Sequence, residues 1–194
     1  MDTVEPYAGG CAEGEKEPDF PPCKKSHMFF PVNTPVGFDC ETAQLVAPYG
    51  AGICSDLIVT VTGYYVAPTN YSFQMTLTSN GGGYVRYKMD TYSRMRSLYE
   101  APAFEEFRPT LNVSVTYRYD HLLEDTRFRD DDYLVFCSRV LKGDGEKIES
   151  ANFGKIRRGI KFSIESARTN TAAMTLSCQF NTMPNDRNLE EKDM

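Results

Sequence analysis

Residues 57–79 read LIVTVTGYYVAPTNYSFQMTLTS, and this stretch decides the fold. In its first half, Leu57, Val59 and Val61 share one strand face. After a break at residues 63–70 the alternation resumes, with Tyr71, Phe73, Met75 and Leu77 on one face and polar residues on the other. Period-two alternation rich in β-branched and aromatic residues predicts strands. Two such strands joined by a Pro-containing loop favour a sandwich of antiparallel sheets.

Similar patterns predict more strands outside this stretch. They fall at residues 28–32, 54–63, 84–89, 111–119, 133–141, 160–164 and 173–180. Residues 79–83, Ser-Asn-Gly-Gly-Gly, supply the positive φ values that a tight hairpin requires. The expected fold is all-β, an immunoglobulin-like antiparallel sandwich of about seven to nine strands with disulfides.

The composition divides the chain into three parts. Residues 1–27 are polar and rich in Pro and Gly, which indicates an irregular N-terminal arm. Residues 28–180 form the sandwich domain. Residues 181–194 form a polar C-terminal tail, which we expect to be disordered. Residues 94–107 and 121–132 are expected to be connections.

Charge and hydropathy exclude several classes of partner. The 194-residue chain has a net charge of -6 and a pI near 5.0, which argues against general nucleic-acid binding and against adsorption to anionic membranes. No apolar run is long enough to cross a bilayer.

The cysteines are even in number and none forms a C-x-x-C pair; they are Cys11, Cys23, Cys40, Cys54, Cys137 and Cys178. Disulfides explain them better than a metal site, and disulfides imply an oxidising compartment. Two glycosylation sequons, at Asn70 and Asn112, point the same way. The N-terminus lacks a signal peptide's apolar segment, so a leader has been removed or the protein is intracellular with free thiols; we favour the first and expect secretion.

Several cysteine pairings are open, because six cysteines permit fifteen arrangements. Cys11 and Cys23 could close a small loop within the arm. Cys54 begins an early strand and Cys178 lies in the last one; first and last strands of sandwiches often adjoin, which makes this pair plausible.

The order of parts resembles the reeler domain, the N-terminal module of reelin and the spondins that also occurs alone in insect defence proteins. The resemblance rests on Cys40, Pro48-Tyr49-Gly50, residues 65–77, Phe136-Cys137-Ser138, residues 160–167 and residues 174–180. It implies a Cys40–Cys137 disulfide and extracellular-matrix or defence-type recognition. The chain departs from the family by having Tyr49 in place of a histidine and by lacking tryptophan altogether.

Catalysis finds little support in the sequence. The chain has two histidines, His27 in the arm and His121 after a strand, and no nucleophile elbow. A cupredoxin copper site is excluded because no histidine follows Cys137 or Cys178. We therefore expect no enzyme activity and no cofactor.

Two charge clusters are candidates for ligand binding. Carboxylates that could hold calcium are Glu124, Asp125, Asp130, Asp131, Asp132, Asp144 and Glu146. Basic residues that could bind an anionic partner are Lys155, Arg157, Arg158 and Lys161, and in a second group Arg86, Lys88, Arg94 and Arg96. Ordinary solvated or salt-bridged surface is the alternative for both clusters.

These observations predict a secreted, non-enzymatic domain that binds a protein or glycan partner. The alternatives are a secreted pathogen effector or decoy, a hydrolytic enzyme, which the scarcity of histidine opposes, and a viral coat subunit, because jelly rolls share this strand pattern.

Overall fold

The computed structural model describes residues 24–79, 81–89, 98–144, 147–166 and 170–189. These residues form eleven strands and a short 3-10 helix, η1 (Phe104–Glu106). The strands are β1 (Lys24–Pro31), β2 (Val36–Asp39), β3 (Gln44–Leu45), β4 (Leu57–Ala67), β5 (Asn70–Thr78), β6 (Gly83–Lys88), β7 (Thr110–Arg118), β8 (His121–Asp125), β9 (Asp132–Lys142), β10 (Ile148–Ser166) and β11 (Thr171–Phe180).

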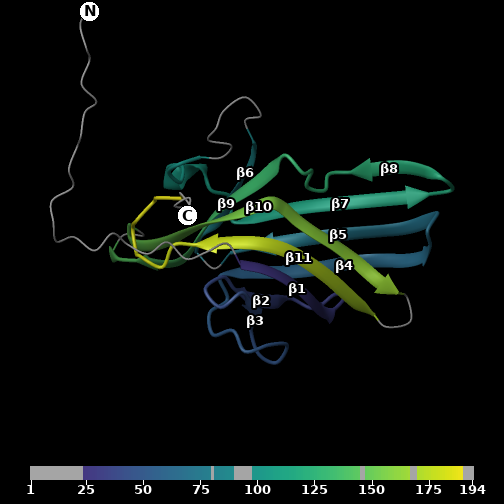
Figure 1. Ribbon diagram of the computed structural model, residues 1–194, viewed down its shortest axis with the longest axis horizontal. Coiled ribbons are helices and arrows are strands. Elements are labelled where there is room, and N and C mark those ends of the chain that lie inside the picture. The colour runs from purple at the N-terminus through teal and green to yellow at the C-terminus, as the bar shows by residue number, and fades with distance from the viewer. Residues whose placement is uncertain (1–23, 80, 90–97, 145–146, 167–169, 190–194) are drawn as a thin grey trace, which may run out of the picture.

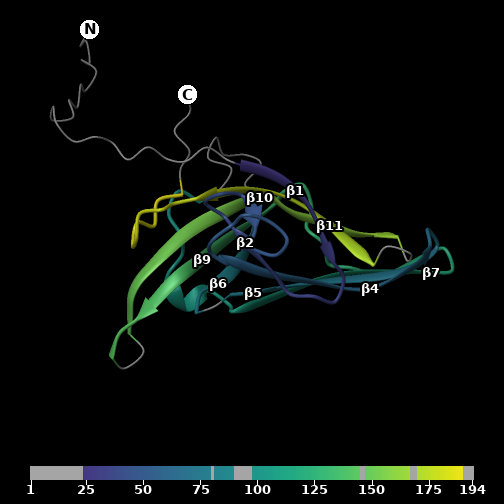
Figure 2. The ribbon, with the colours of Figure 1, turned by 90° about the horizontal axis from the view of Figure 1, so that it is seen from below.

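The strands form two antiparallel sheets packed face to face. The five-stranded sheet has the order β1-β11-β10-β9-β6, and the six-stranded sheet has the order β3-β2-β4-β5-β7-β8. In Figure 1 β10 and β11 run obliquely across the layer of β4, β5 and β7, and Figure 2 shows the two layers from the side. The prediction of an all-β sandwich is confirmed.

The β4–β5 hairpin confirms the strands expected from residues 57–79. Val59 pairs with Leu77 and Val61 with Met75, so their side chains face the interior together. The expected break at Gly63 is wrong, because β4 continues to Ala67. Gly63 has φ 132°, and a Cβ there would lie 1.9 Å from the Ser72 carbonyl oxygen, so only glycine lets the two backbones approach this closely.

The main core lies between the sheets. Its fully buried members include Leu57, Val61, Met75 and Leu77 from one sheet and Leu134, Phe136, Ile156, Met174 and Leu176 from the other. Removing this apolar surface from water is the main driving force for folding.

A second apolar cluster covers part of the outer face of the five-stranded sheet. Tyr133, Val135 and Cys137 alternate with the inward residues of β9, yet they are buried too. Ala101, Phe107 and Leu189 from flanking segments cover them. This double burial explains why residues 133–137 are apolar at every position, and it confirms the expectation of a central strand.

Strand number and boundaries differ from the expected seven to nine. The charged segment after Asp120 contains β8, whose side chains are mostly exposed. The single strand β10 spans 19 residues where only residues 160–164 were expected. Exposed side chains in β8, and buried polar side chains such as Asn152 and Lys155 in β10, interrupt the apolar alternation that periodicity detects.

Both ends of the domain lie beyond the expected limits. β1 begins at Lys24, within the expected arm, and Ser26 and His27 pair with Leu176 and Thr175 of β11. After Phe180 the chain packs against the sheet, where Leu189 is buried and its N–H donates to the Tyr99 carbonyl at 2.7 Å. The expectation of disorder is therefore wrong for residues 181–189.

Candidate functional site

An open hollow of about 370 Å³ lies on the uncovered part of the outer face of the five-stranded sheet. Its lining residues, which we call the basic hollow, are Lys25, Arg157, Arg158, Gly159, Lys161, Thr175, Leu176 and Ser177. Four of these residues carry positive charge, two carry hydroxyl groups, and none is acidic.

Strand register places these side chains side by side. Ser177 of β11 pairs with Lys25 on one side and with Arg157 on the other. One step along the same face, Thr175 pairs with His27 and with Lys161. Neighbouring strands lie about 4.8 Å apart, so the Lys25 and Arg157 backbones are separated by about 10 Å.

A β-bulge in β10 shapes the hollow. Between the pairs Arg157–Ser177 and Lys161–Thr175, β10 contains two residues more than β11 does. Arg158 and Gly159 both have positive φ, 57° and 61°. The bulge interrupts the ladder at this point and leaves the Arg158 side chain exposed.

The inner side of the bulge is held by an aromatic ring. A Cβ on Gly159 would lie 2.2 Å from the Phe128 Cβ, so glycine is required for this contact. The Arg86 guanidinium in turn lies over the Phe128 ring, 4.7 Å from its centroid. The loop before β9 thus supports the backbone of the hollow from beneath.

Three cations of the basic hollow, Lys25, Arg158 and Lys161, are weakly opposed by acidic side chains among the described residues. Lys161 lies 3.5 Å from Asp130, but both side chains are mostly exposed, and such pairs contribute little free energy. Neither Lys25 nor Arg158 has an ion-pair partner in the part of the chain that the structure describes.

Of the four predicted basic residues 155–161, the structure brings together Arg157, Arg158 and Lys161. Lys155 is separate from them, because it is 2% exposed and its Nζ donates to the Leu189 carbonyl at 2.8 Å. Lys25 was not predicted, because it stood within the expected arm. The sequence did contain a signal for it, because Lys25 lies two and four residues before His27 and Phe29 and so shares a strand face with them.

The second predicted basic cluster is engaged by acidic residues. The Arg86 guanidinium lies 2.6 Å from Asp132, and the Lys88 amine lies 2.9 Å from both Asp131 and Asp132. Burial alone would raise the pKa of Asp132, but bonds from Arg86, the Arg129 N–H and Lys88 outweigh it and hold that pKa at about 2. Arg94 and Arg96 lie outside the described residues.

Several carboxylates that could hold calcium instead form ion pairs or hydrogen bonds with neighbouring side chains. Asp125 binds Arg127 at 2.9 Å and Arg129 at 3.2 Å, and chiefly the hydrogen bond from Arg127 holds its pKa at about 2. Glu124 accepts from the Ser114 hydroxyl at 2.7 Å. Within the described residues, no group of three or more His, Cys, Asp or Glu side chains is placed to hold a metal. Asp144 is described, whereas Glu146 is not.

The two histidines lie on different sheets. His27 projects from the outer face of β1, where its Nδ1 lies 2.7 Å from the Thr175 hydroxyl oxygen at the border of the basic hollow. His121 begins the exposed edge strand β8. Among the described residues, neither histidine lies beside both a nucleophile and a carboxylate.

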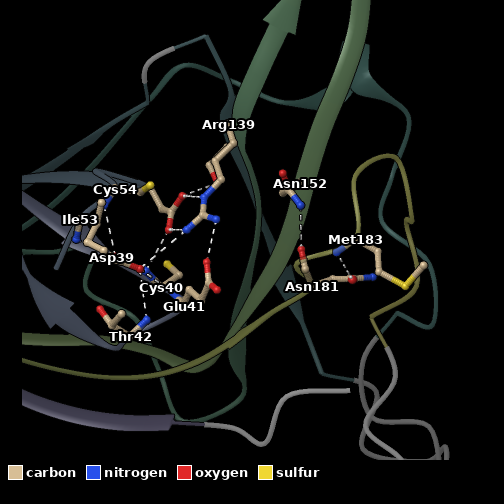
Figure 3. A network of polar contacts seen from close by, with 12 residues as sticks. Asp39, Cys40, Glu41, Thr42, Ile53, Cys54, Arg139, Asn152, Asn181 and Met183 are labelled. Carbon is tan, nitrogen blue, oxygen red and sulfur yellow. Dashed lines mark hydrogen bonds and ion pairs between the residues drawn. The ribbon is translucent and has the colours of Figure 1, made fainter. Parts of the chain in front are cut away.

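A partly buried polar network lies beside Cys40 and Cys54 at the β2 end of the sandwich (Figure 3). Arg139 donates to Asp56 at 2.8 and 3.1 Å and to Glu41 at 2.8 Å. Burial would raise the pKa of Asp39, but four backbone N–H donors hold it below its usual value. Two of these donors come from Ile53 and Cys54. The network fixes the loops around β3, and no sequence pattern predicted it.

The described cysteines are free thiols: Cys40, Cys54, Cys137 and Cys178. The expected Cys40–Cys137 pair is wrong for this structure, because Cys137 belongs to the outer apolar cluster and Cys40 to the core between the sheets. The Cys54–Cys178 bond is likewise not formed. Cys11 and Cys23 lie outside the described residues.

The two sequons lie on the six-stranded sheet. Asn70 begins β5 directly after the β4–β5 turn and is half-buried. Asn112 is exposed in β7, and its side-chain oxygen accepts from the Thr76 hydroxyl at 2.8 Å. Glycosylation at either site stays a prediction.

Comparison of the chain with protein-family models, with curated proteins and with solved structures finds no match. Among the residues placed by the structure, no helix has the length and hydropathy that crossing a bilayer demands.

Proposed function

We propose that this chain is a secreted, non-enzymatic recognition domain whose basic hollow binds an anionic glycan. One observation carries the proposal. In a protein with a net charge of -6, the residues that line this open hollow include four cations and no acidic residue. Charge gathered against the overall sign of a protein supports an anionic ligand.

The chemistry of the hollow favours a multiply charged chain over one small anion. Its cations come from two strands that flank β11, so they are spread across the sheet and do not converge on one point. Thr175 and Ser177 add hydroxyl groups between them. Sulfate or carboxylate groups spaced along a polysaccharide could meet Lys25 and Arg158 in turn, while sugar hydroxyls bond to the strand hydroxyls.

The test is retention on immobilised heparin, which serves as a sulfated glycan of known charge. Lys25→Ala and Arg158→Ala should each elute at lower salt than the unaltered protein, because each removes a cation from the basic hollow. Arg118→Ala is the matched control. It removes one exposed positive charge from β7 on the opposite sheet, where Arg118 contacts Tyr64, and its elution should be unchanged.

The result that opposes the proposal is equally clear. If Arg118→Ala lowers retention as much as Lys25→Ala does, binding reflects overall charge and not this hollow. Elution of the native protein as a large assembly in size-exclusion chromatography would instead favour the coat-subunit alternative. Retention on a single host protein with no affinity for heparin would favour an effector or decoy.

The finer sequence expectations belong to the same proposal. They are an immunoglobulin-like topology, stabilising disulfides, glycosylation at Asn70 and Asn112, and kinship with reeler domains. Secretion is supported by the even number of cysteines and by the sequons.

A further inference from the structure

Two buried thiols from opposite sheets belong to the same core cluster. Cys40 directly follows β2 of the six-stranded sheet, and Cys178 lies in β11 of the five-stranded sheet. Their exposed fractions are 2% and 1%. Both side chains therefore help to fill the space between the sheets.

The surrounding structure holds the two cysteines in this part of the core. Cys178 is paired with Lys24 of β1, and the Lys24 amine reaches across to donate to the Glu41 carbonyl. Ser26 of β1 donates to the Ala43 carbonyl at 2.8 Å. These bonds fasten the loop after Cys40 to the strand beside Cys178.

The backbone of Cys40 is fixed from the other side as well. Its N–H donates to Asp56 at 2.9 Å, and Asp56 is held by Arg139 and Ser138. A disulfide needs two Cα atoms at a narrow range of separations. The bonds on both sides of Cys40 fix its backbone relative to β11, so the fold itself sets the separation of the two Cα atoms.

The other described cysteines are placed differently. Cys137 points to the outer face of β9, where its thiol faces the Gly83 carbonyl at 3.9 Å. Cys54 is partly exposed, and its N–H is bonded to Asp39. Neither shares the interior position of Cys40 and Cys178.

We infer that Cys40 and Cys178 form an inter-sheet disulfide when the chain folds under oxidising conditions. The two thiols give up two protons and two electrons, and a sulfur–sulfur bond forms. A small-molecule disulfide such as oxidised glutathione accepts the two electrons and the two protons and is thereby reduced to two thiols. The inference rests on the placement of these two cysteines and not on the proposed glycan site.

Burial of the two thiols limits disulfide formation to the period before the core has closed. Desolvation, with the neighbouring Cys178 thiol, raises the pKa of Cys40 well above its usual value. Because the thiolate is the reactive species, exchange is slow once the interior has closed. Oxidation therefore belongs to folding, and the finished bond is shielded from reductants.

Peptide mapping without reduction tests the pairing directly. The full chain is refolded in a glutathione redox buffer, free thiols are alkylated, and the protein is cut with trypsin and a glutamyl endopeptidase. Trypsin alone leaves Cys40 and Cys54 in one peptide, residues 26–86, and cleavage after Glu41 separates them. We expect residues 26–41 to be linked to residues 169–187.

Three findings would overturn the inference. The first is a link from Cys40 to residues 42–86, which carry Cys54. The second is a link from Cys40 to residues 130–139, which carry Cys137. The third is recovery of Cys40 in the alkylated form. Each gives a distinct mass.

Thermal unfolding gives a second readout. Protein refolded in the presence of a reductant should have a Tm about 10 °C lower than protein refolded in the glutathione redox buffer, because the bond closes a long loop. Cys40→Ser and Cys178→Ser should abolish this difference between oxidised and reduced samples. Cys137→Ser is the control and should retain it. A difference that survives in Cys40→Ser, or that is lost in Cys137→Ser, contradicts the assignment.

Discussion

Arg139 and Asp56 join the two sheets through a paired contact. Nε of Arg139 donates to one carboxylate oxygen of Asp56 at 2.8 Å, and Nη2 donates to the other at 3.1 Å. Asp56 is 2% exposed, and the Arg139 guanidinium also lies over the Phe180 ring, 4.7 Å from its centroid. The pair therefore connects β9 to the segment that enters β4.

Asp56→Asn should lower the free energy of unfolding by about 3 kcal/mol, since it leaves the charge of Arg139 without its main partner. The measurement is urea unfolding followed by fluorescence. Glu100→Gln is the control, because Glu100 pairs with Arg187 at an exposed position, and we expect a change below about 0.5 kcal/mol. Equal effects of the two variants would show that the Arg139 contact carries no special weight.

The sheets were predictable from sequence, whereas the contacts between loops were not. The alternation around Val59 and Met75 reports which face is buried, so it predicts strands and a sandwich. Asp39 and Asp56 gave no such signal, because their partners are backbone N–H groups and an arginine distant in sequence. Lys155 illustrates the same limit. As part of a basic run it indicated a surface, but it is buried and its amine donates to the Leu189 carbonyl.

The ionisation of Asp132 makes the free energy of unfolding depend on pH. Its pKa is about 2 in the folded chain and 3.8 in the usual case. The folded carboxylate thus holds fewer protons than the unfolded one between these values, so its contribution is present above about pH 4 and lost as pH falls toward 2. We expect a contribution of about 1–2 kcal/mol, allowing for the partly exposed Arg86 and Lys88.

Urea unfolding at several pH values measures this dependence. Asp132→Asn should lose stability at neutral pH and show a smaller further loss between pH 4 and pH 2 than the unaltered protein. Asp131→Asn is the control, because Asp131 is about half exposed and contacts only the exposed Lys88 amine in the ion pairs described. A pH profile of Asp132→Asn parallel to that of the unaltered protein would contradict this role of Asp132.

Gly159 should tolerate substitution poorly. In Gly159→Ala the new Cβ would overlap Phe128 at 2.2 Å and would also sit at φ 61°. We expect a loss of about 2–4 kcal/mol, together with weaker heparin retention because the bulge carries Arg158. Gly81→Ala is the matched control, since φ there is 81° but the nearest atom lies 3.5 Å away, and about 1 kcal/mol is expected. Equal losses would assign the effect to backbone strain alone.

Leu189 tests the packing of the chain after β11. Its side chain is 2% exposed and belongs to the outer apolar cluster. Leu189→Ala should cost about 2–4 kcal/mol in thermal or urea unfolding, as for other buried leucines. Met183→Ala, at a side chain that is 48% exposed, should change stability by less than about 0.5 kcal/mol. A negligible effect of Leu189→Ala would mean that this segment does not cover the sheet in solution.

The salt dependence of glycan binding tests the central claim most directly. The association constant for a heparin oligosaccharide is measured by calorimetry at several salt concentrations, for the unaltered protein and for the double variant Lys25→Ala, Arg158→Ala. Each cation that meets the polyanion displaces about one counterion, so the double variant should bind more weakly, with the slope of log K against log salt reduced in magnitude by about two. An unchanged slope, or binding by the unaltered protein that does not vary with salt, would contradict recognition through the basic hollow.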